Sequence, residues 1–566
     1  MKSQNNISYI RWRFYLLSLL ILLIVAGLVL RLIDLAVVQR HFLRVQGDAR
    51  ALRVVSEPAF RGMMTDRNGY PLAISTSVFS VWINPKEFSA DATSIRALSK
   101  ILSLQFGNTQ KLILQSKTKQ REFVYLKRNL SPEIAQSIKA LAMPGVYLQQ
   151  SYKRFYPEGE IAAQVVGFTN VDDKGQEGLE LAYDQWLTGT AGKKIVTQDR
   201  KGRAISEVEV LQRQQAGHDV VLSINRRIQY LAYRELLRGV QENNAESGSV
   251  VVLDTKTGEV LAMVDQPSFN PNNISQQSKE SFRNRAVTDI FEPGSTVKTF
   301  SAAVGLSSGK YTADSQIDTN PGWYRVGHNI VQDEHNKGLI TLAQILQYSS
   351  NVGISKIILS LPPGNLWQLL HAVGFGQVTG VGFPGEQAGK LVNRAVWPPF
   401  ALATLSFGYG ISVTTLQLAH AYAIIADGGI KLPVSLVRID QPPTGTRVID
   451  AKLAHQVLQL LEVVLLKGGT GVSARVPGYR VAGKTGTARI VGIHGYEKHQ
   501  HVSTFVGIAP VTQPRLVVAV VIHNPRGEKY FGGDVSGPVF EKIMEGSLRI
   551  LNVQPDDPNS LIPTKP

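Results

Sequence analysis

The chain has 566 residues, 43% hydrophobic and 18% charged, so it is long enough for more than one folded domain and is not a disordered polymer. Its net charge of +16 suits a surface near anionic lipid or an anionic wall polymer; no zinc-finger, helix-turn-helix or RNA-binding signature accompanies it, so we expect no nucleic acid. Cysteine is absent, which excludes disulfides and thiolate metal sites.

An apolar run near the amino terminus predicts a membrane anchor. Residues Phe14–Leu30 carry no charge, and Arg31 can snorkel to lengthen the span. We expect a cytoplasmic tail over 1–13 and a transmembrane helix over 14–36. A buried core helix is one alternative, which the basic flank opposes; a signal peptide cleaved near Val25–Gly27 is another, which the continuing apolar run opposes. Positive residues on both sides leave the orientation undecided by charge.

Residues 37–215 predict a mixed α/β module. From Leu35 to about Ala51 the chain continues as a juxtamembrane helix or linker. An Asn-Gly turn within Thr65–Tyr70, between apolar stretches, predicts a β-hairpin. The segment contains no catalytic constellation, so we expect a non-catalytic pedestal and docking surface.

Residues 216–552 predict a second domain. The strand patterns are 219–224, 249–254, 259–264, 479–484, 504–508 and 516–522. The helical patterns include 295–306 and 342–359. An antiparallel sheet built from the first and last segments, with helices flanking it, is an α+β fold. The last residues, 553–566, contain four prolines and predict a disordered tail.

Three short motifs in this domain carry chemistry. They are Ser295-Thr296-Val297-Lys298, Ser349-Ser350-Asn351 and Lys484-Thr485-Gly486. Each alone has an ordinary explanation: a solvated serine and lysine, a helix cap, or a turn at a strand end. In this order they match the S-x-x-K, S-D-N and K-T-G set of penicillin-binding proteins and class A β-lactamases. The combination predicts a serine nucleophile whose base is a lysine.

The local pattern places the first pair. Phe291–Gly294 is turn-like and an apolar helix pattern follows, so Ser295 lies near a helix start with Lys298 one turn further on the same face. A serine hydroxyl needs a base to take its proton, so Lys298 must be neutral when it acts. Burial and a second cation, for which Lys484 is the candidate, both lower a lysine pKa.

Two further boxes precede the catalytic domain. Arg61–Gly69 has the pattern R-G-x-x-x-D-R-N-G, and Gly175–Glu180 has the pattern G-x-E-G-x-E. Together with the three motifs, they resemble the class B penicillin-binding proteins, which are membrane-anchored peptidoglycan D,D-transpeptidases. Phe291–Ser295, Gly408–Gly410 and Val413–Leu418 resemble the cell-division, or septal, type within that family.

The resemblance implies a serine acyl-enzyme. Ser295 would attack the carbonyl between the two terminal D-alanines of a stem peptide, and the amine of a neighbouring stem peptide would then form the cross-link. Lys298 would take the serine proton, and Ser349 would relay a proton to the leaving amine. β-Lactams would acylate the same serine because they mimic the D-alanyl-D-alanine end.

The remaining motif residues are implied in substrate binding. Asn351 would bind the substrate amide, and Lys484 would supply positive charge. Thr485, Gly486 and Thr487 would form the binding strand, with the two threonines holding the terminal carboxylate. The backbone N–H groups of the nucleophile and of Thr487 would form the oxyanion hole. The resemblance implies neither a metal nor a cofactor.

A place in the cell is implied as well. The chain would cross the inner membrane once, with its catalytic domain in the periplasm, and would act in septal wall synthesis. Its partners would be peptidoglycan stem peptides, β-lactams and division-machinery proteins, including a lipid-II-polymerising glycosyltransferase.

Four other functions share parts of the pattern. An elongation-type enzyme more often has proline in place of Glu292 and glutamine in place of Tyr409. A β-lactamase would usually have aspartate at Ser350 and would lack the N-terminal boxes. A β-lactam-sensing receptor needs a cytoplasmic signalling domain, for which the segment before the span is too short. A non-catalytic division scaffold need not keep the complete set of motif residues.

Overall fold

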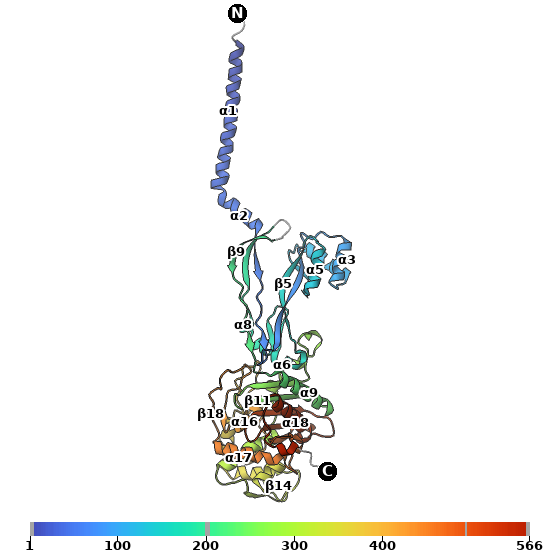
Figure 1. Ribbon diagram of the computed structural model, residues 1–566, viewed down its shortest axis with the longest axis vertical. Coiled ribbons are helices and arrows are strands. Elements are labelled where there is room, and N and C mark those ends of the chain that lie inside the picture. Colours follow the sequence, from blue (N-terminus) through green and yellow to red (C-terminus); the bar gives the residue numbers. More distant parts are fainter. Residues whose placement is uncertain (1–4, 199–203, 493–494, 562–566) are drawn as a thin grey trace. The chain divides into compact units, whose positions relative to one another are not determined.

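The computed structural model describes residues 5–198, 204–492 and 495–561 (Figure 1). They form two compact units, each discontinuous in sequence. The first unit comprises Met1–Phe60, Ser77–Tyr152 and Gly189–Ala216; the second comprises Arg61–Thr76, Lys153–Thr188 and Gly217–Pro566. Two segments from the expected pedestal range, Arg61–Thr76 and Lys153–Thr188, therefore belong to the same compact unit as the catalytic motifs.

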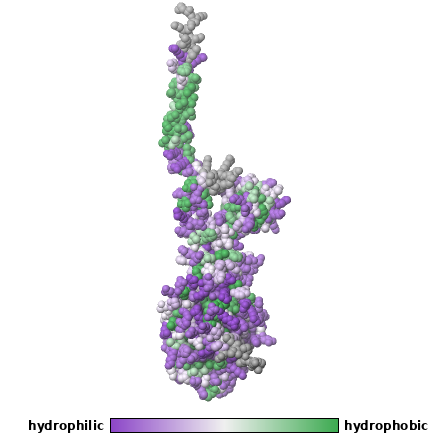
Figure 2. All heavy atoms as spheres, in the orientation of Figure 1, coloured by the Kyte–Doolittle hydropathy of each residue, from purple (hydrophilic) through white to green (hydrophobic). Residues whose placement is uncertain are grey.

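The first unit begins with a long apolar helix. α1 (Asn5–Ile33) is followed by the π-helical turn η1 (Asp34–Val38) and by α2 (Arg40–Ala51). The stretch Arg11–Val38, which covers most of α1 and all of η1, is long and apolar enough to cross a membrane. The most apolar window of this stretch has no buried residues. Figure 2 shows this stretch as a hydrophobic band along α1. An apolar helix that is not covered by protein fits the predicted anchor and not a buried core helix.

The rest of the first unit contains two β systems. β1 (Leu52–Glu57), β8 (Gly192–Gln198) and β9 (Ala204–Gln212) form an antiparallel sheet in the order β1-β8-β9. The other elements are β3 (Pro71–Ile83) from Ser77 onward, β4 (Val124–Leu130), β5 (Val146–Phe155) as far as Tyr152, α3 (Ala92–Ile101), α4 (Phe106–Thr118) and α5 (Pro132–Ala140). Apolar side chains of these strands and helices share one small core.

A buried charge network explains why the two boxes belong to the second unit. Glu180 is fully buried, and its carboxylate accepts hydrogen bonds from Arg61 Nε at 2.7 Å and Arg154 Nε at 2.6 Å. Arg61 also donates to Asp184 Oδ1 at 2.7 Å. The arginine of the first box therefore neutralises the last glutamate of the second. Gly178 has φ +61°, and a Cβ there would lie 2.6 Å from the Gly167 nitrogen, so only glycine fits.

Short elements surround this network. They are β2 (Met64–Thr65), α6 (Ala163–Val166), β6 (Phe168–Thr169), β7 (Gly175–Glu177), α7 (Gly178–Ala182), α8 (Asp184–Leu187) and β10 (Val220–Val221). β10 pairs in parallel with β2, whereas the sequence predicted a longer strand over 219–224. Beyond Val221, the Leu222 N–H still donates to Thr65 O and Leu222 makes an isolated bridge to Val437, but the strand ends because the chain continues into the cap of the following helix.

Replacing Glu180 with alanine should lower the free energy of unfolding by about 3–5 kcal/mol, because two buried guanidinium groups lose their shared carboxylate. The check is urea denaturation of the purified chain followed by tryptophan fluorescence. Glu242→Ala is the matched control, because its partner Arg238 forms an exposed pair with it; we expect a change below about 1 kcal/mol. Equal unfolding midpoints for the two variants would contradict the role given to Glu180.

The second unit is built on one five-stranded antiparallel sheet. Its strands, in spatial order, are β12 (Val260–Gln266), β11 (Ser247–Asp254), β21 (Leu516–His523), β20 (Gly495–Ala509) and β19 (Ala482–Gly492). Every residue of β11 and β12 is buried, so both faces of the sheet are covered. The prediction of an antiparallel sheet made from the first and last segments is confirmed.

Two successive residues of β11 identify the layers on the two faces. A Cβ on Gly248 would meet Leu236 of α9 (Arg226–Glu242), which packs with α18 (Gly532–Ile550). The next residue, Ser249, points to the other face and hydrogen-bonds Thr415 Oγ1 of α16 (Thr415–Ala426) at 2.7 Å. Helices α9 and α18 therefore cover one face of the sheet, and the wholly buried α16 covers the other (Figure 1).

A further group of helices in the second unit brings the first two motifs together. They are α10 (Arg285–Thr288), α11 (Lys298–Ser307), α12 (Leu342–Tyr348), α13 (Asn351–Leu359), α14 (Gly364–Ala372), α15 (Pro399–Leu405) and α17 (Ala451–Glu462). Short strand pairs accompany them: β13 (Gln316–Asp318) with β16 (Leu339–Thr341), β14 (Trp323–Val326) with β15 (Asn329–Gln332), and β17 (Ile430–Lys431) with β18 (Thr446–Arg447). The helical pattern 342–359 is interrupted at Ser349 and Ser350, so it forms two helices where the sequence suggested one segment.

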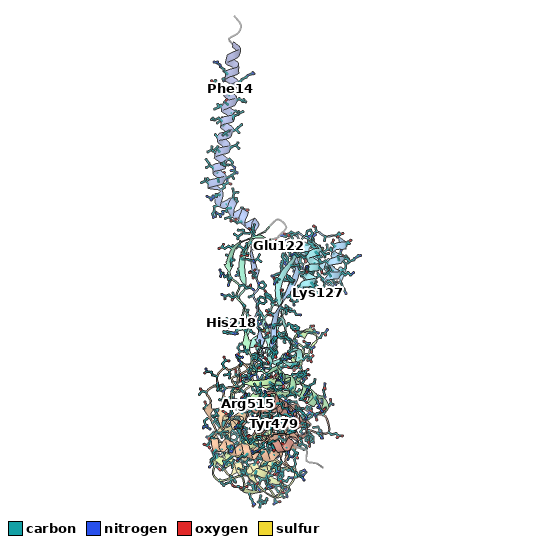
Figure 3. The ribbon with its side chains drawn as sticks, viewed as in Figure 1. Phe14, Glu122, Lys127, His218, Tyr479 and Arg515 are labelled. Carbon is teal, nitrogen blue, oxygen red and sulfur yellow. The ribbon has the colours of Figure 1, made fainter. Side chains whose placement is uncertain are left out.

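The carboxyl terminus differs from the expected disordered tail. Val553 O accepts a hydrogen bond from the Tyr479 hydroxyl at 2.7 Å, and Asp556 accepts one from the Arg480 N–H at 2.7 Å (Tyr479 is labelled in Figure 3). A short 3-10 turn, η8 (Pro558–Leu561), follows. The prolines indicated disorder, but the carboxylate and carbonyl groups of this segment satisfy backbone and side-chain donors just before β19. Residues 562–566 lie outside the described range.

Candidate active site

The first motif lies where a 3-10 turn leads into a helix. Ser295 is in the turn η5 (Gly294–Val297), and α11 begins at Lys298. The turn is fixed by Tyr422 of α16, whose buried hydroxyl donates to Thr296 O at 2.8 Å and shares a hydrogen bond with Thr299 Oγ1. Ser295 itself is half-buried. The predicted position near a helix start is thus what the structure has, with a 3-10 turn as the first turn.

One serine hydroxyl lies between two lysines. Lys298 is fully buried, and its Nζ donates to the Ser349 carbonyl oxygen and lies 3.2 Å from Ser349 Oγ. On the other side, Lys484 Nζ lies 3.1 Å from the same Oγ and 3.3 Å from Thr485 Oγ1. The three motifs, far apart in the sequence, therefore meet at Ser349 Oγ. This arrangement can pass a proton between amine and hydroxyl groups.

Burial sets the charge of both lysines. It lowers the pKa of Lys298 to about 7, against the nearby charges of Asp333 and Glu334, which raise it. Burial also lowers the pKa of Lys484 well below its ordinary value, and the charge of Lys298 lowers it further. The motif indicated a charged Lys484; in the structure neither ammonium is strongly favoured, because both are removed from water and they repel each other.

The second motif has a strained backbone. Ser349 ends α12 in the left-handed region, with φ +61° and ψ +41°, which costs a non-glycine residue free energy. Ser350 then caps α13, because its Oγ accepts the Gly353 N–H at 2.9 Å. Asn351 is half-buried, and its Nδ2 donates to Gln332 O at 3.0 Å. The break between the two helices is what turns the Ser349 hydroxyl toward both lysines.

The third motif lies on β19, against the nucleophile turn. A Cβ on Gly486 would lie 2.8 Å from Pro293 O and 3.1 Å from Thr296 Cγ2, so any side chain there would push the Ser295 turn away. Thr487 continues the strand, and its Oγ1 accepts the Gly532 N–H at 3.0 Å. The glycine of the motif is therefore required by the close approach of strand and turn.

The structure brings the predicted residues into one region. Lys298, Ser349, Lys484 and Thr485 are joined by hydrogen bonds, whereas Gly486 and Thr487 adjoin the turn that carries Ser295. Asn351 lies two residues after Ser349 in the chain, and its side-chain amide nitrogen donates to Gln332 O.

One buried residue was missed. Asp333 hydrogen-bonds the start of α13, and no local pattern reveals this, because the carboxylate and the helix that it caps are separated by residues 334–338, β16 and α12. A search for an acidic partner of the helix start would have had many candidates in the sequence.

Comparison with known proteins agrees with this geometry. Residues 248–545 match the family model "Penicillin binding protein transpeptidase domain", and residues 56–222 match "Penicillin-binding Protein dimerisation domain". The chain is 42% identical over 560 residues to peptidoglycan D,D-transpeptidase FtsI of Escherichia coli K12, covering 98% of this chain and 94% of the relative. It is 41% identical over 547 residues to the probable peptidoglycan D,D-transpeptidase PbpC of Pseudomonas aeruginosa, covering 96% of each.

Two solved structures are also similar. The transpeptidase domain of penicillin-binding protein 3 from Burkholderia pseudomallei is 40% identical, with a TM-score of 0.55, and the match covers 59% of this chain and 97% of that one. A peptidoglycan synthetase from Bifidobacterium adolescentis is 27% identical, with a TM-score of 0.71, and that match covers 90% of this chain and 98% of the other.

Proposed function

This chain belongs to the penicillin-binding protein family as a septal-type class B peptidoglycan D,D-transpeptidase, and on that basis we propose that Ser295 is its nucleophile. The enzyme cross-links stem peptides through a serine acyl-enzyme and binds β-lactams. The observation that carries the assignment is the placement of Ser349 Oγ within hydrogen-bonding distance of both Lys298 and Lys484.

In the first half-reaction, the Ser295 oxygen bonds to the carbonyl carbon of the penultimate D-alanine while Lys298 takes the hydroxyl proton. The C–N bond to the terminal D-alanine then breaks. Its nitrogen receives the proton from Lys298 through the Ser349 hydroxyl, which contacts both lysines. In the second half-reaction, an acceptor amine loses its proton to the same relay and attacks the acyl carbon. The bond to the Ser295 oxygen then breaks, and that oxygen takes the proton back from Lys298.

Two backbone N–H groups would stabilise the tetrahedral intermediate. They are those of Ser295, in the first turn before α11, and of Thr487, on the strand that runs against that turn. The close approach at Gly486 keeps the strand and the turn together. Donors fixed in this way act on charge that develops only in the transition state, which is where hydrogen bonding accelerates a reaction.

The substrate itself would restore the charge of Lys484. The terminal carboxylate, held by Thr485 and Thr487, would place a negative charge beside Lys484 and raise its pKa. Lys484 would then be the cation of the complex and favour the neutral form of Lys298. Asn351 would bind the substrate amide at the open end of the same site.

Product analysis tests this function directly. The purified enzyme, given a peptide ending in D-alanyl-D-alanine and a second peptide with a free side-chain amine, should release D-alanine and form the cross-linked product. Benzylpenicillin should block both. Rapid turnover of nitrocefin without cross-linking would instead indicate a β-lactamase.

We also propose that the chain spans the inner membrane once, with 1–13 in the cytoplasm, 14–36 as the anchor, 37–215 as the pedestal and 216–552 as a periplasmic catalytic domain. The apolar, unburied α1 supports the anchor. A lipid-II-polymerising glycosyltransferase and other division proteins are the proposed partners, with α1 and the pedestal as docking surfaces.

The orientation can be measured with single cysteines, because the chain has none of its own. Ser89→Cys, at an exposed position of the first unit, should react with a membrane-impermeant maleimide on cells with a permeabilised outer membrane. Ser3→Cys should react only after the inner membrane is opened. Labelling of Ser3→Cys in intact spheroplasts would contradict the proposed orientation.

A further inference from the structure

We propose that Asp333 is a positioning residue of the acyl-transfer site, whose carboxylate fixes the second motif and thereby holds the Ser349 hydroxyl between Lys298 and Lys484. The inference rests on the proposed roles of these three residues. It assigns no contact with substrate to Asp333; the residue acts through Ser349.

The carboxylate is bound on both oxygens by the start of α13. Asp333 is buried, with 8% of its surface exposed, and it directly follows β15. Its Oδ1 accepts the backbone N–H groups of Asn351 and Val352, the latter at 2.9 Å. Its Oδ2 accepts the Ser350 hydroxyl at 2.6 Å. A carboxylate at a helix start with several donors is a strong cap, because it meets the positive end of the helix.

The strand side of the contact is fixed as well. The Asp333 N–H donates to Gly322 O at 2.9 Å, which ties it to the neighbouring β-turn. One residue earlier, Gln332 O accepts Asn351 Nδ2 at 3.0 Å. The strand end and the helix start are therefore joined by a set of hydrogen bonds centred on one buried charge.

This set of hydrogen bonds explains how the strained serine persists. On one side, the N–H groups of Ser349 and Ser350 both donate to Ile345 O, which holds them to the end of α12. On the other side, the Asp333 carboxylate holds Ser350 and Asn351. With both neighbours fixed, Ser349 cannot leave the left-handed region, and its Oγ and carbonyl stay directed at the lysines.

The second motif also shows where the carboxylate comes from. In the S-D-N form of the motif, the middle residue is itself an aspartate. Here the middle residue is Ser350, which donates its hydroxyl proton to Asp333. The negative charge is thus supplied by another segment of the chain at the same helix start.

A charge so placed must influence the proposed base. The charged groups that face Lys298 are Lys484 from β19 and Asp333 and Glu334 from the segment after β15. The two carboxylates raise the pKa of Lys298 against the effect of burial. Removing the Asp333 charge should therefore lower that pKa, and the pH at which acylation becomes fast should fall with it.

The test is the rate of acylation by a fluorescent penicillin between pH 5 and 9, measured on the full chain. For Asp333→Asn we expect a loss of about tenfold to a hundredfold on the high-pH plateau, because the hydroxyl is misplaced, and a midpoint shifted to lower pH. For Ser350→Ala, which removes the hydroxyl that donates to Asp333 and accepts the Gly353 N–H but keeps the Asp333 charge, we expect a smaller loss and an unchanged midpoint. Glu334→Gln is the matched control: it removes a neighbouring charge from an exposed side chain, and its plateau should equal that of wild type.

The outcomes separate the two proposals. Thermal unfolding shows whether the two variants are folded. If Asp333→Asn and Ser350→Ala are folded and acylate at the wild-type rate with the wild-type pH midpoint, the positioning role of Asp333 is overturned. If Asp333→Asn does not fold, the reduced plateau of Ser350→Ala decides, and a wild-type plateau there overturns the role. A wild-type enzyme that is not acylated at all would overturn the function proposed for Ser295 instead.

Discussion

Replacing Ser295 with alanine is expected to abolish covalent labelling by a fluorescent penicillin. Without the hydroxyl oxygen no acyl-enzyme can form, and turnover of a D-alanyl-D-alanine substrate should fall by a factor on the order of 10⁶, as found when a serine nucleophile is removed elsewhere. The measurements are a fluorescent gel and the intact mass of the protein, which should gain one acyl group in wild type and none in the variant.

The structure provides a matched control for this experiment. Ser308 is exposed at the end of α11, and its hydroxyl bonds local backbone: it donates to Gly305 O and accepts the Lys310 N–H. Ser308→Ala should label like wild type. Ser295 is half-buried, and the turn around it is fixed by the Tyr422 hydroxyl, so Ser295→Ala should keep its unfolding temperature. Retained label on Ser295→Ala, or a wild type that takes none, would show that another residue is the nucleophile.

Replacing Lys298 with methionine should slow acylation by about 10²–10⁴-fold, the usual contribution of a general base. Methionine fills a similar volume but cannot accept a proton. The pH profile gives a second readout, because the neutral amine is the active form and the pKa of Lys298 is about 7. In wild type, acylation should rise as the pH increases through about 7 and then level off. In the variant this rise should disappear.

Lys337→Met controls for the loss of a positive charge near the second motif. Lys337 is exposed and lies 4.9 Å from the centre of the Tyr348 ring. The Lys337→Met enzyme should be acylated at nearly the wild-type rate, with the same pH midpoint. A Lys298→Met variant that keeps the rise near pH 7 would assign that titration, and the role of base, to another group.

The sheet could be predicted largely from sequence because its strands carry strong local signals. The apolar runs 249–254 and 259–264 predicted two strands of an antiparallel sheet, and the structure pairs them as β11 and β12. The discontinuous units could not be predicted in this way. Arg61 and Glu180 carry no local sign that they form an ion pair, because only the folded chain brings them together.

The site shows the same contrast. The three motifs are short and have fixed spacing, so Ser295, Lys298 and Lys484 could be selected without coordinates. The break of the helix at Ser349 and the role given to Asp333 depend on contacts between segments far apart in sequence. The extent of burial is equally hidden: Lys484 is the cation that the sequence suggested, but burial lowers its pKa well below the ordinary value.

The strand order of the central sheet also has a consequence for biogenesis. β11 is flanked by β12, its neighbour in the chain, and by β21, so that Val250 pairs with Val520. A sheet with such high contact order cannot close until nearly the whole catalytic domain has been synthesised, and until then the apolar β11 has an open edge. β19, which completes the site, also lies late in the chain. We therefore expect the nascent enzyme to be inactive toward wall precursors and dependent on protection from aggregation, until its last strands arrive.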